Sequence, residues 1–386
     1  MIYLDNAATT YPKPPAVIKA VNNTFAYSAN PGRAGHKMSI KASEILYGCR
    51  ERIGKLLNFD ITENIILLPS CTMALNTVIK GTLERGDHVV ISSLEHNSVL
   101  RPLKRLADDG IITFDVAKVY EKDMDATVDS FRKLIRDNTK LCVCTHASNV
   151  FGVKLPVSQI CALCHYYGVL FCIDAAQSMG VVDIDISDID ADYICSPGHK
   201  GLYAPMGTGF LIVNSDRYPT ELIEGGTGSS SIDDKQPSAL PDRYESGTVN
   251  LSGFAGLSAG IDFVNRKRIN VIRDHEMKLI RYLYDELSGM KDVILYTSRP
   301  ETKYYVPILS FNIKDVDCDV LSQQLDRKYG IALRSGIHCS PLAHSHFGTQ
   351  DIGTVRVSPS VFTDEFAVKS LINVVFQVIK NKKIFI

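Results

Sequence analysis

Seven short apolar segments alternate with helix-length segments between residues 60 and 215, and this alternation limits the fold more than any other feature of the chain. The apolar segments are 64–68, 88–92, 111–116, 141–145, 169–173, 192–195 and 208–213. Helical patterns lie between several of them, at 72–82, 98–109, 127–137 and 157–167. Strands alternating with helices predict an α/β unit with a mostly parallel sheet. The strands are apolar throughout, as expected where both faces of a sheet are covered.

The pattern changes after about residue 253. Helical patterns and short strands follow, at 254–267, 271–289, 305–312, 317–329, 331–334, 354–358 and 363–381. We therefore predict a large domain over 15–253 and a smaller α+β domain over 254–386, with segment 1–14 packing near the smaller one. Thr363 and Asp364 are expected as N-cap and first-turn residues of the last helix. The polar segment 225–242 is expected to be a long functional loop.

Composition excludes several classes of protein. The 386 residues carry 42 Lys and Arg against 43 Asp and Glu, so no basic stripe for nucleic acid is expected. No apolar run reaches the ~18 residues of a membrane span, and the N-terminus does not resemble a secretory signal. We expect a cytoplasmic protein that contacts neither nucleic acid nor membrane. Of its ten cysteines, those within apolar runs are expected to be buried thiols: Cys142, Cys144, Cys172 and Cys195.

Polar side chains follow five of the predicted strands, where ligands bind in open α/β sheets. These exits carry Ser70-Cys71-Thr72, Glu95-His96-Asn97, Ser148-Asn149, Asp174-Ala175-Ala176-Gln177 and Ser196-Pro197-Gly198-His199-Lys200. Taken singly each has an ordinary structural explanation, such as a helix N-cap at Ser70 to Thr72 or an Asx turn at Asn149. Their joint placement at strand exits is what favours a ligand site.

The set matches the needs of pyridoxal phosphate (PLP). Lys200 can supply the amine of a Schiff base, and Asp174 a carboxylate for the pyridinium nitrogen, so that the ring can act as an electron sink. His96 can stack on the ring, and Gln177 can donate to the ring oxygen. The phosphate can bind at the helix start beside Thr72. Ser196 and His199 can add further phosphate bonds.

Motifs along nearly the whole chain support this assignment. They are LDNAATT (4–10), NPGRAGH (30–36), LEHNSVLRP (94–102), HASNVFG (146–152), DAAQS (174–178), SPGHKGLYAPMGTG (196–209), ESGTVN (245–250), RSGIHCSPLAH (334–344) and GTVRVSPSVFTDEF (353–366). With these motifs the sequence resembles the class V aminotransferase superfamily, specifically the cysteine desulfurases and selenocysteine lyases. The resemblance implies a fold-type-I PLP-dependent transferase that works as a homodimer.

The resemblance also implies a role for each matching position. Lys200, Cys339 and His96 match the catalytic residues. The cofactor-binding positions are Lys200, Asp174, Gln177, His96, Cys71, Thr72, Ser196 and His199, with Thr248 reaching the phosphate of the neighbouring subunit. The substrate-binding positions are Ala8, Asn149 and Arg356, and no metal is expected. Cys71, Met73 and the Pro-Gly pair before His199 depart from the family pattern, which leaves the phosphate contacts open.

The expected reaction converts L-cysteine into alanine with a persulfide on Cys339. Lys200, with a lowered pKa, would remove the Cα proton, and His96 would shuttle protons. The cations His338 and Arg334 would favour the thiolate of Cys339. The sulfur would pass to an acceptor that the sequence does not identify, which could be a scaffold protein, a carrier protein or a small thiol.

Other readings stay open at this point. The same scaffold could act as a selenocysteine lyase, a cysteine sulfinate desulfinase or an aminotransferase, or could bind PLP without turnover. A different class would be a metal or redox protein built on Cys142, Cys144, Cys161 and Cys164.

Overall fold

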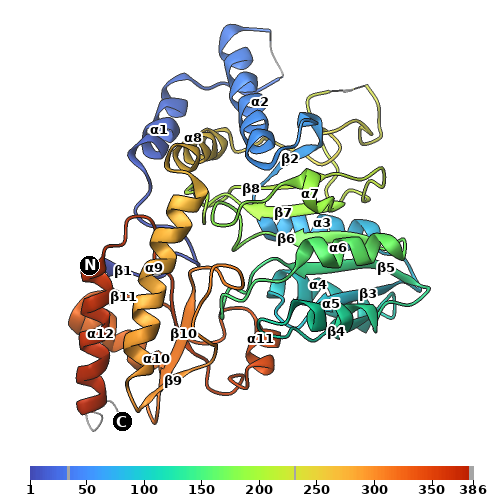
Figure 1. Ribbon diagram of the computed structural model, residues 1–386. Coiled ribbons are helices and arrows are strands. Elements are labelled where there is room, and N and C mark those ends of the chain that lie inside the picture. Colours follow the sequence, from blue (N-terminus) through green and yellow to red (C-terminus); the bar gives the residue numbers. More distant parts are fainter. Residues whose placement is uncertain (33–34, 230–231, 382–386) are drawn as a thin grey trace.

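The computed structural model describes residues 1–32, 35–229 and 232–381. Within these ranges the largest sheet has seven strands in the order β2-β8-β7-β6-β5-β3-β4 (Figure 1). The strands are β2 (Ile65–Leu68), β3 (His88–Ser92), β4 (Thr113–Ala117), β5 (Thr139–Thr145), β6 (Leu170–Asp174), β7 (Tyr193–Pro197) and β8 (Gly209–Val213). β8 is antiparallel to both of its neighbours, and the other pairings are parallel. The predicted α/β fold with a mostly parallel sheet is confirmed.

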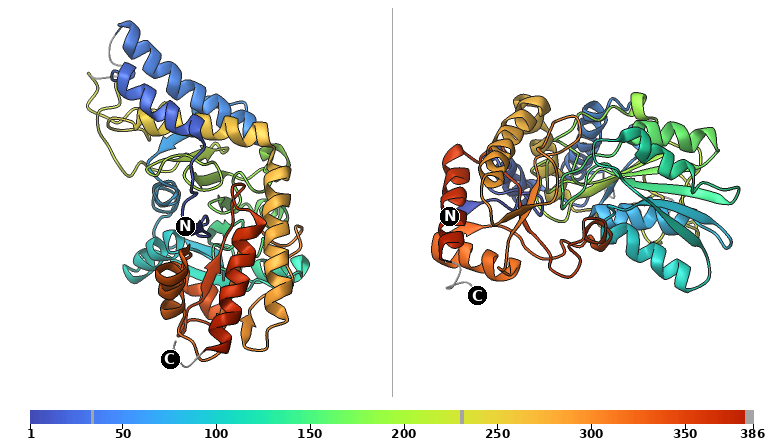
Figure 2. Two further views of the ribbon diagram at one scale, coloured as in Figure 1. Left: turned by 90° about the vertical axis from the view of Figure 1, so that its left-hand side faces the viewer. Right: turned by 60° about the horizontal axis from the view of Figure 1, so that its bottom comes forward.

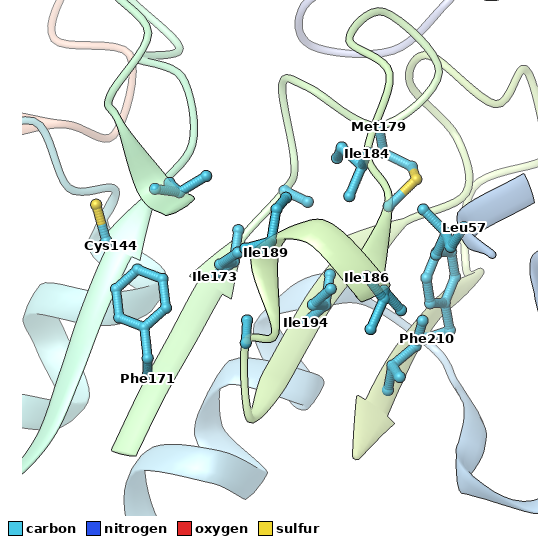
Figure 3. Packing of buried hydrophobic residues seen from close by; sticks show 14 of the residues in the cluster. Leu57, Cys144, Phe171, Ile173, Met179, Ile184, Ile186, Ile189, Ile194 and Phe210 are labelled. Atoms are coloured by element: carbon cyan, nitrogen blue, oxygen red, sulfur yellow. The ribbon is translucent and has the colours of Figure 1, made fainter. Parts of the chain in front are cut away.

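Helices cover both faces of this sheet, which explains why its strands are apolar throughout. The helices of this part are α1 (Pro15–Tyr27), α2 (Lys37–Leu57), α3 (Cys71–Thr82), α4 (Asn97–Asp108), α5 (Met124–Arg132), α6 (Val157–Tyr166), α7 (Ile186–Ile189) and α8 (Leu251–Lys267), with the 3-10 turn η1 (Thr62–Asn64). Alternate residues of one strand point to opposite faces. Phe171 thus packs in the cluster containing α2, α6 and α8, whereas Cys172 packs in the cluster containing α3 and α4. Figure 3 shows the first cluster around Phe171, Ile173 and Ile194.

A second group of elements contains the C-terminal third of the chain. It comprises α9 (Ile269–Ser288), β9 (Val293–Leu295), β10 (Leu309–Ile313), α10 (Cys318–Tyr329), β11 (Ile331–Ala332), α11 (Pro341–His346), β12 (Val355–Val357) and α12 (Glu365–Lys380). The order β12-β10-β9 forms an antiparallel sheet, and β1 (Ile2–Tyr3) pairs in parallel with β11. Leu283 of α9, Leu321 of α10 and Leu371 of α12 share one hydrophobic cluster. Figure 2 shows α9 and α12 running side by side over this sheet.

Helix α8 bears on the predicted domain boundary. Its Phe254, Leu257 and Ile261 belong to the same hydrophobic cluster as the large sheet. The division at residue 253 stays a prediction, and we propose that the folding units instead separate near Arg268, between α8 and α9. Segment 1–14 lies beside the C-terminal group through the pairing of β1 with β11.

Several element bounds differ from those expected. Asp364, not Thr363, is the N-cap of α12: its carboxylate accepts from the Ala367 N–H at 2.9 Å, while the Thr363 hydroxyl accepts from the Ser360 N–H. Helix α5 begins earlier than predicted, because the Asp123 side chain caps it by accepting from the Ala126 N–H, and it also ends earlier, at Arg132. The strand predicted over 305–312 is β10, which begins only at Leu309. Helices α1 and α2 were not predicted.

The segment 225–242 has neither helix nor strand in its described residues, and Ser230 and Ser231 lie outside them. Arg33 and Ala34 of the NPGRAGH motif also lie outside the described residues. Within the described chain, no helix is both long and apolar enough to cross a membrane.

Candidate active site

A cavity of about 230 Å³ opens at the carboxyl ends of the parallel strands. Thr145, Asp174 and Pro197, each the last residue of its strand, line it. Segments far away in the sequence complete the lining, since Ala7 and Ala8 follow β1 and Arg356 lies on β12. Both groups of elements therefore contribute to the site, as the strand-exit rule predicts for the larger one.

Lys200 and Asp174 both line this cavity. Asp174 is 2% exposed, and its Oδ1 accepts from the Ala176 N–H at 2.9 Å. Lys200 lies in a turn after β7, where its carbonyl accepts from the Tyr203 N–H at 2.8 Å and from the Thr10 hydroxyl at 3.2 Å. Burial lowers the pKa of Lys200 below its usual value, and the negative charge of Asp174 opposes this shift. The cavity thus holds a buried carboxylate and an amine that deprotonates more easily than a free lysine.

His96 lies at the start of α4 and also lines the cavity. Its Nδ1 accepts from the Ser98 N–H at 3.0 Å, which caps the helix. Burial lowers the pKa of His96 to about 4, although Asp174 acts in the opposite direction. The ring is therefore neutral near pH 7, and because Nδ1 is the acceptor, Nε2 carries the proton.

Other predicted cofactor residues also reach the cavity. Gln177 donates to the carbonyl of Ala7 at 3.0 Å, which leaves the second N–H of its amide for a ligand. Thr72 lies in the first turn of α3, whose N-cap is Ser70. His199 lines the cavity, burial lowers its pKa to about 4, and its Nδ1 is buried without a hydrogen-bond partner in the described residues.

Two predicted cofactor residues lie outside the lining. Ser196 is fully buried, and its hydroxyl donates to the carbonyl of Pro197 at 3.2 Å. Pro197, the next residue, lines the cavity where Ser196 does not. Thr248 is exposed on the loop before α8. Its predicted contact is with a neighbouring subunit, and no contact within its own cavity was expected.

Arg356 and Asn149 form a polar corner of the cavity. Arg356 is 1% exposed; it donates from Nη2 to Asp5 Oδ1 at 2.5 Å and from Nη1 to the Asn149 carbonyl at 2.8 Å. Its Nε has no partner among the described residues. A buried guanidinium with an unused N–H suits an anionic ligand such as a carboxylate. Asp5 was missed in the sequence, although it lies in the LDNAATT motif.

Cys339 lies at the rim, exposed, one residue after the cavity-lining His338. Both residues have positive φ, of 52° and 57°, which is unusual for non-glycine residues. Two hydrogen bonds hold the backbone of these two residues. Asn149 Nδ2 donates to the His338 carbonyl at 2.7 Å, and the Asn97 N–H donates to the Cys339 carbonyl at 2.8 Å. The same Asn149 therefore links the rim to the Arg356 corner.

The charges beside Cys339 differ from those expected. Burial lowers the pKa of His338 to about 2, so its ring is neutral and supplies no positive charge. Arg334 does supply one, with Nη2 3.6 Å from the Cys339 sulfur. The expectation of two cations is thus corrected to one.

The cysteines expected in the core are buried, and so are Cys161 and Cys164. Across the described ranges, no group of three or more His, Cys, Asp or Glu side chains is arranged to hold a metal ion. The packing of these thiols among apolar side chains explains their burial without a ligand.

Comparison with known proteins agrees with this geometry. The family described as Aminotransferase class-V matches residues 2–371, and the chain belongs to this family. Its members are PLP enzymes. Within it, the chain is 35% identical over 366 residues to a probable cysteine desulfurase of Methanothermobacter thermautotrophicus, covering 92% of this chain and 89% of that one.

Two solved structures have the same fold. One is the apo structure of the cysteine desulfurase from Thermococcus onnurineus, with a TM-score of 0.90, 30% identity and coverage of 98% of this chain and 94% of that one. The other is the cysteine desulfurase CsdA from Escherichia coli, with a TM-score of 0.87, 25% identity and coverage of 98% and 94%.

Proposed function

We propose that this chain is a PLP-dependent cysteine desulfurase that converts L-cysteine into L-alanine and leaves the sulfur on Cys339. The observation that carries the proposal is one cavity lined by Lys200, Asp174, His96 and Arg356, with an exposed thiol at its rim. Relatives named as cysteine desulfurases over most of the chain support the same reaction.

The residues present fit PLP, because the cavity offers a buried carboxylate, an amine of lowered pKa and an unpartnered buried His199 nitrogen. Lys200, Asp174, Gln177 and His96 would hold the ring. Thr72, His199 and the first turn of α3 would hold the phosphate, with Thr248 added from a partner subunit. When bound, PLP supplies an electron sink for the electron pair released at Cα.

Arg356 and Asn149 would bind and orient the carboxylate of the substrate, beside Ala8. With this end held, the Cα–H bond can face Lys200, whose lowered pKa makes it a better base near neutral pH. Neutral His96, with its proton on Nε2, can exchange a proton with groups in the cavity.

Cys339 would act as the nucleophile. Its thiolate attacks the substrate sulfur, a new S–S bond forms, and the Cβ–S bond of the substrate breaks with its electron pair left on carbon. Protonation of that carbon and return of a proton to Cα complete alanine, and the transferred sulfur remains on Cys339 as a persulfide. The guanidinium of Arg334 donates to this sulfur at 3.6 Å and can hold it at the rim of the cavity.

Mass spectrometry of Cys339 after incubation with L-cysteine tests this proposal. We expect one added sulfur on Cys339 and about one alanine per persulfide before an acceptor is added. Cys339→Ser should remove the added sulfur, since a persulfide needs a thiol, whereas the control Cys318→Ala, a buried thiol away from this cavity, should retain it.

Other outcomes would contradict the proposal. Alanine production with unmodified Cys339 excludes the persulfide, and turnover confined to selenocysteine or to cysteine sulfinate assigns a different lyase. Transfer of the amino group to pyruvate assigns an aminotransferase.

We also propose that the enzyme is a cytoplasmic homodimer that delivers sulfur to an acceptor protein. Support for the dimer comes from large apolar side chains exposed on α1 and α2, namely Ile18, Phe25, Tyr27, Met38, Ile40 and Tyr47. Both helices pack on α8, so these side chains lie on one layer of the molecule, where exposed apolar surface favours a protein interface.

A further inference from the structure

Cys71 is a second thiol in the proposed active site, and it differs from Cys339 in its surroundings. It is the first residue of α3, lines the cavity and is 8% exposed. Its Sγ lies 3.6 Å from Oδ1 of Asp174. The mechanism above does not use this contact.

The direction of the Cys71–Asp174 hydrogen bond follows from the state of the thiol. Burial and the negative charge of Asp174 raise the pKa of Cys71 well above its usual value. The thiol therefore stays protonated, and it is the donor to the carboxylate. Cys71 is accordingly a poor nucleophile, unlike an exposed thiol beside a guanidinium.

Both hydrogen bonds to the Asp174 carboxylate end on the same oxygen. Oδ1 accepts from the Cys71 thiol and from the Ala176 N–H, while Oδ2 has no hydrogen bond in the part of the chain that is described. Two donors on Oδ1 fix the rotation of the carboxyl group and leave Oδ2 for a donor of a ligand.

The backbone of Cys71 is held in place by the sheet. A Cβ added at Gly209 would lie 2.7 Å from the Ser70 carbonyl carbon and 2.9 Å from the Cys71 nitrogen. Glycine at 209 thus lets β8 pack directly against the start of α3, and this contact fixes the backbone position from which the thiol extends. The Ser70 hydroxyl, accepting from the Met73 N–H at 3.1 Å, caps the same turn.

We propose that Cys71 is a positioning residue that orients Asp174, so that Oδ2 receives the N–H of the cofactor's ring nitrogen. The inference rests on the proposed function, because it requires PLP in this cavity. It extends that function by assigning a task to a residue that departs from the family pattern.

The test compares Cys71→Ala and Cys71→Ser with the wild-type holoenzyme, using two readouts besides turnover. The first is the dissociation constant of PLP, which we expect to rise about fivefold to tenfold in Cys71→Ala, as for the loss of one ordinary hydrogen bond, because S–H is a weak donor. The second is the pH midpoint of the bound cofactor's absorbance change, which should move upward. In Cys71→Ala, Asp174 would lose its orientation and would hold the proton of the ring nitrogen less well. Loss of that proton removes a positive charge near the nitrogen of Lys200, which therefore keeps its own proton to higher pH.

Cys71→Ser retains an O–H donor and should recover at least half of both changes, whereas a role in packing alone predicts no difference between serine and alanine in the absorbance midpoint. Cys195→Ala, a buried thiol of the same hydrophobic cluster, serves as the matched control and should leave that midpoint unchanged. Wild-type values for both readouts in Cys71→Ala would overturn the inference. Failure of the wild-type protein itself to bind PLP would overturn the proposed function instead, so the two failures are distinguishable.

Discussion

Arg356 is the largest fully buried side chain in the described chain, and it carries a charge. Burying a guanidinium is unfavourable unless its donors are satisfied, yet its Nε finds no partner in the part of the chain that the structure describes. The carboxylate of Asp5, which follows β1, neutralises the charge of Arg356, and the Asn149 carbonyl accepts a second N–H of the guanidinium. At the scale of single residues, the structure thus retains an unused donor where a substrate carboxylate is expected.

Arg356→Lys should raise the KM for L-cysteine about tenfold to a hundredfold with a smaller change in kcat, because one ammonium cannot keep the contacts with Asp5 and Asn149 and also donate to the substrate carboxylate. Steady-state kinetics measures this, and thermal unfolding shows whether the variant still folds. Arg52→Lys, at the partly exposed pair with Asp262, is the matched control and should leave KM unchanged. An unaltered KM in a folded Arg356→Lys would exclude Arg356 from substrate binding.

At the scale of elements, a side chain of α9 contacts the turn that carries Lys200. Glu276 of α9 is 4% exposed and hydrogen-bonds with Tyr203, whose hydroxyl also accepts from the Val361 N–H at 3.3 Å. Tyr203 has a φ of 57°, so this anchor holds a residue in a left-handed conformation three positions after Lys200. Helix α9 therefore supports the lysine turn from outside the large sheet.

Glu276 should also make stability depend on pH. Burial raises its pKa to about 8, so the folded protein keeps a proton that the unfolded chain loses near pH 4.5. The raised pKa means that stability is highest below pH 4.5 for this group and falls as pH rises toward 8. Relative to wild type, Glu276→Gln should gain about 1 kcal/mol of unfolding free energy for each pH unit across this window.

Urea unfolding at pH 5, 6, 7 and 8 measures this difference. Glu286→Gln, an exposed change on the same helix, should give a difference that is constant with pH. A constant difference for Glu276→Gln as well would show that the folded-state pKa of Glu276 is not raised.

At the scale of the whole molecule, α1, α2 and α8 pack together at one end, beyond the large sheet (Figure 1). The apolar side chains exposed on α1 and α2 lie on this layer. Thr248, just before α8, is exposed and does not line the candidate active-site cavity of its own chain. Both observations fit a second copy of the chain docking here.

The double variant Phe25→Glu and Tyr47→Glu should convert a dimer into a monomer, because it places charge in a desolvated apolar contact. Sedimentation velocity measures the mass, and PLP affinity should fall in parallel if Thr248 serves the partner's site. Tyr166→Glu, an equally exposed aromatic on α6, should leave the dimer intact. A wild-type protein that sediments as a monomer would contradict the dimer.

Prediction from sequence succeeded where the signal is local. Apolar strands separated by helices define the sheet, and residues at strand ends such as Asp174 and His96 can be found because parallel strands end at one edge. No helix was predicted at α1 and α2, which lie before the first of the apolar segments that defined the sheet.

The sequence by itself determined the α/β class, the lysine and carboxylate at two strand exits, and the thiol of a polar loop, because each depends on residues close together in the chain. Tertiary structure alone decided the charge state of His338, the pairing of Arg356 with Asp5, the absence of Ser196 from the lining and the contact of Cys71 with Asp174. These depend on burial and on segments up to 351 residues apart. Desolvation and charge pairing act through space, and a linear pattern carries no record of either.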